Sequence, residues 1–255
     1  MPAIPFNRAN IDVSDRALLA TAIENGHISG NGAFTKQAES SLQDSLGASR
    51  ALLTTSCTHA LEMSALLTKV GPGDEVIVPS FTFVSSASAF LLFGATPIFV
   101  DVEQNSLNID PTALEKAITP RTKAICIVHY GGISADLDKI LEIAKANNLA
   151  VIEDNAHGLF STYKGKPLGS FGILATQSFH ETKNIICGEG GALIVNDESM
   201  VERAEILREK GTNRSRFLRG QVDKYTWVDI GSSWVMSDLL AAILYGQLQR
   251  ADEIN

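Results

Sequence analysis

Short apolar runs alternate with segments of helical periodicity between residues 51 and 195, and this alternation limits the chain to few folds. The runs at 75–78, 123–128 and 150–153 contain β-branched residues, which is typical of buried strands. The helical segments between them end at turn residues such as Gly71-Pro72-Gly73. Strands that alternate with helices form a mostly parallel sheet covered on both faces. The sequence therefore predicts an α/β fold whose ligands bind beyond the C-terminal ends of the strands.

The same patterns place the individual elements. After an irregular arm at 1–12, we expect one large domain over 1–235, followed over 236–255 by the start of a helix that leads to a smaller C-terminal domain. No helix stop signal precedes Asn255, so we expect that domain to lie beyond this chain. The expected helices are 14–24 capped by Ser14, 34–46, 58–70, 83–93, 111–118 capped by Asp110, 137–146 and 198–210. The expected strands are 51–54, 75–78, 97–102, 123–128, 150–153, 171–179 and 192–195.

Charge and composition exclude several classes of protein. The 255 residues carry a net charge of −8, which opposes general binding to nucleic acid or to a membrane surface. The sequence has no apolar run of about 18 residues, the length that a membrane-spanning helix needs. It begins without a secretory signal, and its cysteines, Cys57, Cys126 and Cys187, form no CxxC pair that would indicate zinc or a disulfide. We therefore expect a cytoplasmic protein without a metal site.

One lysine lies between two predicted core strands. The apolar run 171–179 gives way to a short polar loop that contains Lys183, and glycines at 188–191 lead into the run 192–195. A lysine in such a loop is held firmly, and partial burial lowers its pKa. Its amine then becomes a nucleophile that forms a Schiff base with an aldehyde. Taken alone, this pattern belongs more often to an ordinary surface lysine. The choice between a surface lysine and a Schiff-base lysine therefore depends on the rest of the chain.

A predicted strand end carries groups suited to a phosphate. Thr55-Ser56-Cys57-Thr58 follows the run 51–54 and opens a predicted helix. Free backbone N–H groups and hydroxyls at a helix start bind anions, and Ser178 belongs at the same edge of the sheet. Simple helix capping explains the same four residues, and by itself it is the more frequent case.

Three further residues follow predicted strands. Phe83 lies after the strand that ends at 78, where its ring can stack on a flat ligand or pack in the core. Asp154 closes the run 151–153, and a carboxylate buried there needs a positive partner, such as a protonated pyridine nitrogen, unless it caps a helix. His157 lies three residues further on and either faces the same ligand or serves as a structural histidine.

Together these residues supply a phosphate cup, an aromatic ring, a carboxylate and a lysine, each at a predicted strand end. That set is typical of a site for pyridoxal 5′-phosphate (PLP). The chain also resembles the DegT/StrS-type sugar aminotransferases, which are PLP enzymes of fold type I. The resemblance extends from residue 4 to the last predicted helix, and the segments that carry it most clearly are 79–84, 153–157, 178–184 and 188–191.

The resemblance implies a role for each residue. Lys183 would bind the aldehyde, Asp154 would pair with the pyridine nitrogen, and Phe83 would stack on the ring. Cys57, Thr58 and Ser178 would hold the phosphate, and His157 would lie near the ring hydroxyl. Two positions depart from the family pattern. Many relatives have glycine where Cys57 stands, and many have an asparagine that reaches the partner's phosphate where Ser233 stands.

The resemblance also implies the reaction and the assembly. It predicts a homodimer with shared active sites, L-glutamate as amino donor, and a dTDP-4-keto-6-deoxyhexose as acceptor. Segments 209–215 and 220–227 resemble the members of the family that make dTDP-4-amino-4,6-dideoxygalactose. That sugar would enter surface polysaccharides such as O-antigen or enterobacterial common antigen. Another nucleotide-linked keto sugar remains the alternative acceptor.

A basic stretch follows the core. In an acidic chain, residues 211–235 gather four basic side chains and several aromatic ones. They form either a solvated loop or an arm that meets an anionic substrate or a partner subunit. A nucleotide sugar carries a diphosphate and a flat base, so basic and aromatic groups suit it. The candidate substrate residues are Arg214, Arg219 and Tyr225.

Three other functions compete with the transaminase. A PLP-dependent sugar dehydratase shares the fold, but that branch replaces the aldehyde-binding lysine, and Lys183 is present. A nicotinamide oxidoreductase would need a GxGxxG motif before a helix, whereas the glycines at 188–191 precede a predicted strand. An inactive fragment or sensor of the same fold is the third. A bound chromophore would distinguish a PLP enzyme from the oxidoreductase. Catalytic turnover would distinguish an enzyme from an inactive fragment or sensor.

Overall fold

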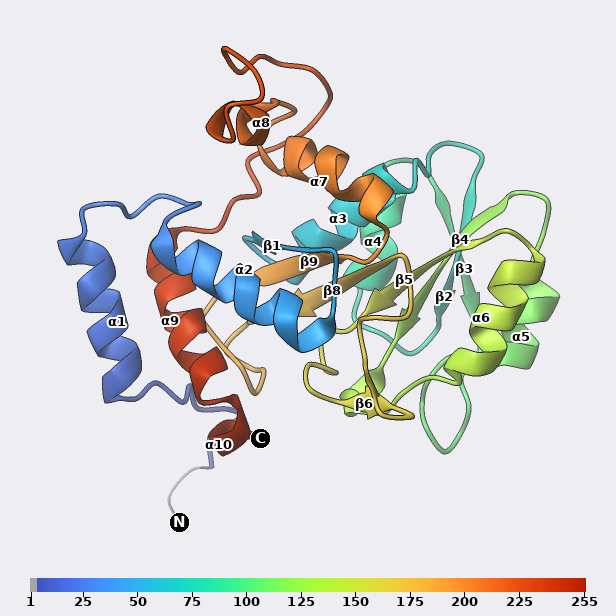
Figure 1. Ribbon diagram of the computed structural model, residues 1–255. Coiled ribbons are helices and arrows are strands. Elements are labelled where there is room, and N and C mark those ends of the chain that lie inside the picture. The colour runs from blue at the N-terminus through green and yellow to red at the C-terminus, as the bar shows by residue number, and fades with distance from the viewer. Residues whose placement is uncertain (1–3) are drawn as a thin grey trace.

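A computed structural model describes residues 4–255, so residues 1–3 of the expected N-terminal arm lie outside the described range. The strands of its main sheet follow the spatial order β1 (Arg50–Thr54), β9 (Gly191–Val195), β8 (Leu174–Ser178), β5 (Ala150–Asp154), β4 (Thr122–Val128), β2 (Glu75–Pro79) and β3 (Thr96–Val100) (Figure 1). Neighbours from β8 to β3 are parallel, and β9 is antiparallel to both β1 and β8. The prediction of an α/β fold with a mixed, mostly parallel sheet is confirmed. A small antiparallel hairpin, β6 (Thr162–Tyr163) and β7 (Lys166–Pro167), was not predicted.

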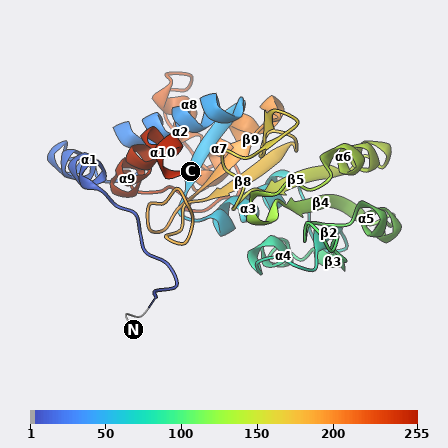
Figure 2. The same cartoon turned by 90° about the horizontal axis from the view of Figure 1, so that it is seen from below.

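Helices cover both faces of this sheet. Figure 2 shows α2 (Ala33–Leu46) and α3 (Cys57–Leu67) on opposite sides of β8 and β9. The other helices are α1 (Val13–Glu24), α4 (Ser85–Leu91), α5 (Pro111–Ala117), α6 (Leu137–Ala146), α7 (Val201–Arg208), α8 (Arg214–Leu218), α9 (Asp238–Gln249) and α10 (Ala251–Ile254). Short 3-10 turns occur at Tyr130–Gly132 and Glu198–Met200. None of the helices described is long and apolar enough to cross a membrane.

Successive residues of a strand point to opposite faces, and this sorts the core into layers. Leu52 of β1 packs with α3, α4 and α7, whereas Leu53 packs with α2 and α9 on the other face. In β4, Cys126 belongs to the same cluster as Leu52, on the face covered by α3, α4 and α7. Its neighbour Ile127 belongs to a third cluster, formed with α5 and α6. Because the strands are buried on both faces, their sequences are continuous apolar runs.

Several element boundaries differ from the predictions for local reasons. Asp12, not Ser14, caps α1, because its carboxylate accepts hydrogen bonds from the N–H groups of Ser14 and Asp15. The Asp15 side chain accepts the N–H of Asp12 in return, which completes a capping box. The helix expected at 198–210 is divided into a 3-10 turn and α7. Asp110 caps α5 as predicted, and α8 was not predicted.

Helix α9 belongs to the same core as the elements before residue 235. Met236, Ala241 and Leu244 are buried in the same cluster as α2 and β9. Figure 1 shows α9 beside α1 and α2. Gln247 of α9 donates a hydrogen bond to the buried carboxylate of Asp15 at 2.8 Å, which ties α9 to α1. The packing is therefore continuous across the boundary that we expected between residues 235 and 236.

A buried charge network joins α2, β1 and α7. Glu39 Oε1 lies 2.6 Å from the guanidinium of Arg208, and both side chains are only 3% exposed. Glu39 Oε2 pairs with Arg50 at 2.9 Å. The Leu53 N–H donates to Glu39 Oε1 at 3.1 Å, and its carbonyl accepts from Arg208 at 3.1 Å. The network thus holds the end of β1 just before the chain turns into α3.

We predict that Glu39→Ala destabilises the protein by about 3–5 kcal/mol, because it leaves the buried guanidinium of Arg208 without its anion. Urea unfolding at neutral pH measures the change. The matched control is Glu202→Ala, which removes an exposed ion pair with Arg216 and should cost less than about 1 kcal/mol. Equal effects of the two substitutions would contradict the role given to the buried network.

Candidate active site

The strand ends converge on one cavity of about 610 Å³. It lies where β1, β2, β4, β5 and β8 end and where the loop before β9 returns to the sheet. The structure brings all seven residues predicted for the cofactor into its lining: Cys57, Thr58, Phe83, Asp154, His157, Ser178 and Lys183. The fold therefore assembles in space a set that is spread over more than a hundred residues of sequence.

The N-terminus of α3 opens into this cavity. Ser56 is its N-cap and accepts the N–H of His59 at 3.1 Å. The first amides of an α-helix have no acceptor within the helix, so they are available to an anion. The Thr58 hydroxyl lies 2.7 Å from that of Ser85 and faces the same space. Burial raises the pKa of the Cys57 thiol far above its usual value, so Cys57 adds no negative charge to an anion site.

A glycine permits the wall of this anion site. A Cβ atom at Gly191 would collide with the carbonyl of Ser56 and the backbone nitrogen of Cys57. Only a residue without a side chain lets the start of β9 approach α3 so closely. The glycines that sequence analysis placed before the last strand therefore serve close packing around the cavity.

Asp154 supplies a buried negative charge. Its side chain is at the end of β5, and the residue is 5% exposed. Ser86 donates to Oδ2 at 2.6 Å, and the N–H of Ala156 donates to Oδ1 at 3.2 Å. Within residues 4–255, no basic side chain forms an ion pair with this carboxylate. A buried carboxylate is costly without a positive partner, so the cavity suits a ligand that carries one.

Lys183 lies in a firmly held loop on the same cavity. Backbone hydrogen bonds close the loop from Phe179 to Gly190 at 2.9 Å and from Glu181 to Gly188 at 2.9 Å. The Lys183 N–H donates to the carbonyl of His180 at 2.9 Å. Burial lowers the pKa of the Lys183 amine, and the negative charge of Asp154 offsets only part of this effect. The amine is thus easier to deprotonate than an exposed lysine.

Aromatic side chains form the rim. Phe83 is 73% exposed, so its ring is free to stack on a flat ligand. Phe81 and Tyr130 lie with ring centroids 4.5 Å apart, and Tyr130 meets the ring of His157 edge-on at 5.2 Å. Sequence analysis missed Tyr130, although it directly follows the strand that ends at residue 128, and the strand-end rule would have found it. Ser56, part of the predicted anion site, lines the cavity too, and sequence analysis also missed Phe81, Thr82, His180, Thr182 and Glu189 as lining residues.

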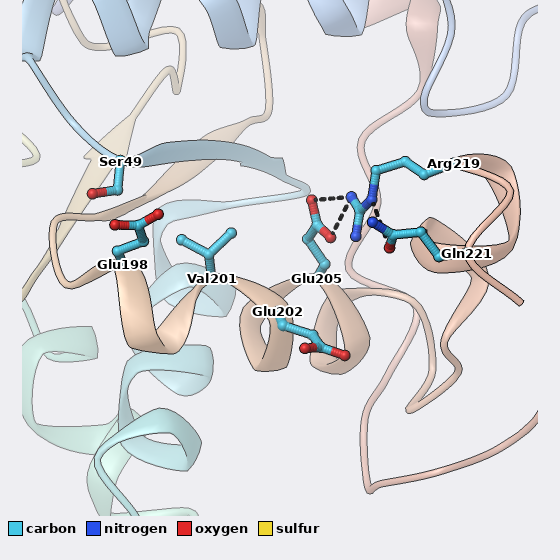
Figure 3. A pocket seen from close by; sticks show the side chains of 7 residues that line it. All are labelled: Ser49, Glu198, Val201, Glu202, Glu205, Arg219 and Gln221. Atoms are coloured by element: carbon cyan, nitrogen blue, oxygen red, sulfur yellow. Dashed lines mark hydrogen bonds and ion pairs between the residues drawn. The ribbon is translucent and has the colours of Figure 1, made fainter.

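The residues predicted for the sugar nucleotide lie outside this cavity. Arg219 Nη1 donates to both oxygens of the buried carboxylate of Glu205, at 2.8 and 3.1 Å, beside a separate hollow of about 580 Å³ (Figure 3). Tyr225 packs on Phe217 with ring centroids 5.8 Å apart. Arg214 begins α8 and is exposed, with no ion pair to any residue within 4–255. Ser233 is exposed at a backbone bridge to Glu209.

We predict that Lys183 loses its proton at lower pH than Lys164, whose pKa the carboxylate of Asp138 raises. Deprotonated amines react with acetic anhydride, so competitive labelling over a range of pH, read by mass spectrometry, gives a titration midpoint for each lysine. The Lys183 midpoint should lie below that of Lys164, because burial disfavours the charged amine. Coincident midpoints would contradict this.

Comparisons with known proteins identify the family of the chain. Residues 9–255 match the DegT/DnrJ/EryC1/StrS aminotransferase family. The chain is 37% identical over 254 residues to the spore coat polysaccharide biosynthesis protein SpsC of Bacillus subtilis, covering 98% of this chain and 65% of that protein. It is 38% identical over 253 residues to the GDP-perosamine synthase of Caulobacter vibrioides, covering 99% of this chain and 66% of that protein.

A solved structure gives the same result. A Streptococcus pneumoniae protein, described as a candidate sugar aminotransferase in its PLP form, superposes with a TM-score of 0.89 and 32% identity. The match covers 98% of this chain and 67% of that one. This chain thus spans 65% and 66% of the lengths of its two curated relatives. The chain belongs to the DegT/DnrJ/EryC1/StrS aminotransferase family, a family of PLP-dependent sugar aminotransferases.

Proposed function

We propose that this protein transfers an amino group from L-glutamate to the 4-keto carbon of a nucleotide-linked 4-keto-6-deoxyhexose. One observation carries the proposal. Asp154, a buried carboxylate with no basic partner in the described part of the chain, shares a cavity with Lys183, a half-buried lysine of lowered pKa, and with a helix N-terminus. These groups match the three parts of PLP: its pyridine nitrogen, its aldehyde and its phosphate.

The residues of the cavity fit the cofactor. Asp154 would hold the protonated pyridine nitrogen and keep it charged. The first amides of α3, with the hydroxyls of Thr58 and Ser178, would hold the phosphate. Phe83 would cover a face of the ring. When bound, PLP supplies the aldehyde that accepts the amino group and a ring that accepts electrons.

Lys183 would bind the aldehyde and move a proton. A neutral amine at Nζ is needed for both tasks, and burial favours that form. Once glutamate takes its place, the freed amine acts as a general base and then as a general acid beside the reacting carbon. The firmly held loop from Phe179 to Gly190 keeps Nζ within the cavity through these exchanges.

We propose a dTDP-linked sugar as the acceptor, with dTDP-4-amino-4,6-dideoxygalactose as the product. Segments 209–215 and 220–227 support this through their resemblance to the transaminases that make it. A GDP-linked sugar is the second candidate, because one relative is named a GDP-perosamine synthase. The product would enter polysaccharide synthesis, the process for which the Bacillus subtilis relative is named.

We also propose that the enzyme acts as a homodimer with shared active sites. Large exposed apolar side chains in and next to α4 support this, since Phe83, Val84, Leu91 and Leu92 are all more than half exposed. In the arm at 211–235, Trp227 is 79% exposed. The arm would cross to the partner, where Arg214 and Tyr225 would meet the acceptor.

We predict that Asp154→Asn slows the glutamate half-reaction by ten- to a hundredfold or more, because a charge-assisted hydrogen bond worth roughly 1.5–3 kcal/mol is lost. Stopped-flow absorbance of the PLP-loaded protein measures this rate. Asp101→Asn, at an exposed position, is the matched control.

Two further experiments test the cofactor and the product. Borohydride should trap PLP on the peptide that contains Lys183, and mass spectrometry should find a new amino sugar when dTDP- or GDP-linked 4-keto-6-deoxyhexose is added. Trapping on another peptide, or the absence of any amino sugar, would contradict the proposal.

We further predict that Arg214→Glu raises the KM for the sugar nucleotide by about tenfold and leaves the glutamate half-reaction nearly unchanged. Arg219→Glu should differ, because it places a carboxylate against Glu205 and releases the arm from α7. That variant should lower thermal stability as well as raise KM. If Arg214→Glu damages both half-reactions equally, the residue supports folding or assembly instead.

A further inference from the structure

Ser86 holds the buried carboxylate of Asp154 from the first turn of α4. Its hydroxyl donates to Asp154 Oδ2 at 2.6 Å, a length typical of a strong hydrogen bond to a charged oxygen. Ser86 is fully buried, so bulk water does not compete for this contact. The other oxygen, Oδ1, accepts the N–H of Ala156 at 3.2 Å. Both oxygens of the carboxylate are therefore held by donors of the protein.

A second hydroxyl supports the first. Thr82 Oγ1 lies 2.7 Å from Ser86 Oγ. A hydroxyl carries one proton and an ionised carboxylate only accepts, so Ser86 donates to Asp154 and Thr82 must donate to Ser86. Thr82 lines the cavity, so a chain of hydroxyls runs from the cavity through Ser86 to the carboxylate. In such a chain each hydrogen bond polarises and strengthens the next.

The start of α4 is fixed in its place. Ala89 and Phe90 of this helix are buried in the same cluster as residues of α3. The hydroxyl of Ser85 lies 2.7 Å from that of Thr58 in α3. Two successive serines thus contact two parts of the site, Ser85 near the helix N-terminus and Ser86 at the carboxylate.

We propose that Ser86 is a positioning residue that keeps Asp154 ionised, so that the proton between this carboxylate and the bound cofactor stays on the pyridine nitrogen. This rests on the proposed PLP function. In a buried site an ion pair competes with a neutral pair, formed when the N–H bond breaks and an O–H bond forms on the carboxylate. Donors to the charged carboxylate oppose this transfer. The hydroxyl chain therefore favours the protonated ring, the form that accepts electrons.

A purely structural role gives a different expectation. A buried hydroxyl needs a hydrogen-bond partner in any case, and the contact with Asp154 satisfies that need. If Ser86 only fills its place in α4, its removal lowers stability and leaves the proton of the cofactor where it was. If Ser86 acts through the charge of Asp154, its removal moves that proton.

Nitrogen magnetic resonance of the holoprotein, loaded with PLP that carries ¹⁵N in its ring, measures this proton directly. At pH 7 we expect a protonated ring nitrogen in the wild-type protein, a shift towards the unprotonated form in Ser86→Ala, and a smaller shift in Thr82→Val. Ser88→Ala, at an exposed position of the same helix, is the matched control and should leave the signal unchanged. An unchanged signal in Ser86→Ala would overturn the proposal. If Ser86→Ala no longer binds PLP, the signal of Thr82→Val decides in the same way.

Urea unfolding of the cofactor-free protein tests the contact itself. Ser86→Ala should lower the unfolding midpoint. This shift should be smaller by about half or more when Asp154 is already replaced by asparagine, because a neutral amide accepts a weaker hydrogen bond than a carboxylate. An equal shift in both backgrounds would mean that the hydroxyl does not act on the charge of Asp154, and the proposal would fall.

The two measurements separate this inference from the proposed function. If the wild-type protein fails to bind PLP, the proposed function fails, and with it the role towards the pyridine nitrogen, whatever the urea experiment shows. If PLP binds at Lys183 and the ring nitrogen keeps its proton in Ser86→Ala, the proposed function stands and the inference about Ser86 falls.

Discussion

The carboxylate of Asp154, buried at the end of β5 with no basic partner among residues 4–255, is the constraint on which the rest of the site depends. A lone buried charge is costly, so the protein surrounds it with donors from Ser86 and Ala156 and leaves one direction open to the cavity. Lys183, the helix N-terminus at Ser56 and His157 all face the same space. The cavity therefore favours a ligand that brings its own positive charge, together with an aldehyde and an anion.

The residue before Asp154 shows how one strand serves two purposes. Side chains alternate along β5, so Glu153 and Asp154 leave the sheet on opposite faces. Glu153 binds backbone N–H groups and His129, and it organises the loops behind the site. Asp154 faces the cavity. Two adjacent carboxylates are thus both buried, yet one binds the surrounding loops and the other faces the cavity.

Much of the fold could be predicted because its signals are local. Apolar runs bounded by glycine and proline give the strands, and Asp110-Pro111 gives the start of α5. The convergence of the seven residues proposed to hold the cofactor could be predicted because parallel strands bring their C-terminal ends to one edge. The ion pair of Arg219 could not be predicted from the sequence, because Glu205 becomes its partner only when α7 packs beside the arm at 211–235. Likewise, the apolar stripe after Met236 predicts a helix but does not say that α1 and α2 cover it.

The sequence by itself determined the order of strands and helices, the lysine loop and the residues at each strand end, since these depend on periodicity and on turn residues. The tertiary structure decided what each group can do. The lowered pKa of Lys183 comes from burial, the close approach at Gly191 from the packing of β9 on α3, and the hydrogen bond to His157 Nδ1 from the Gly131 N–H. These properties depend on distances between residues far apart in the chain, which only folding sets.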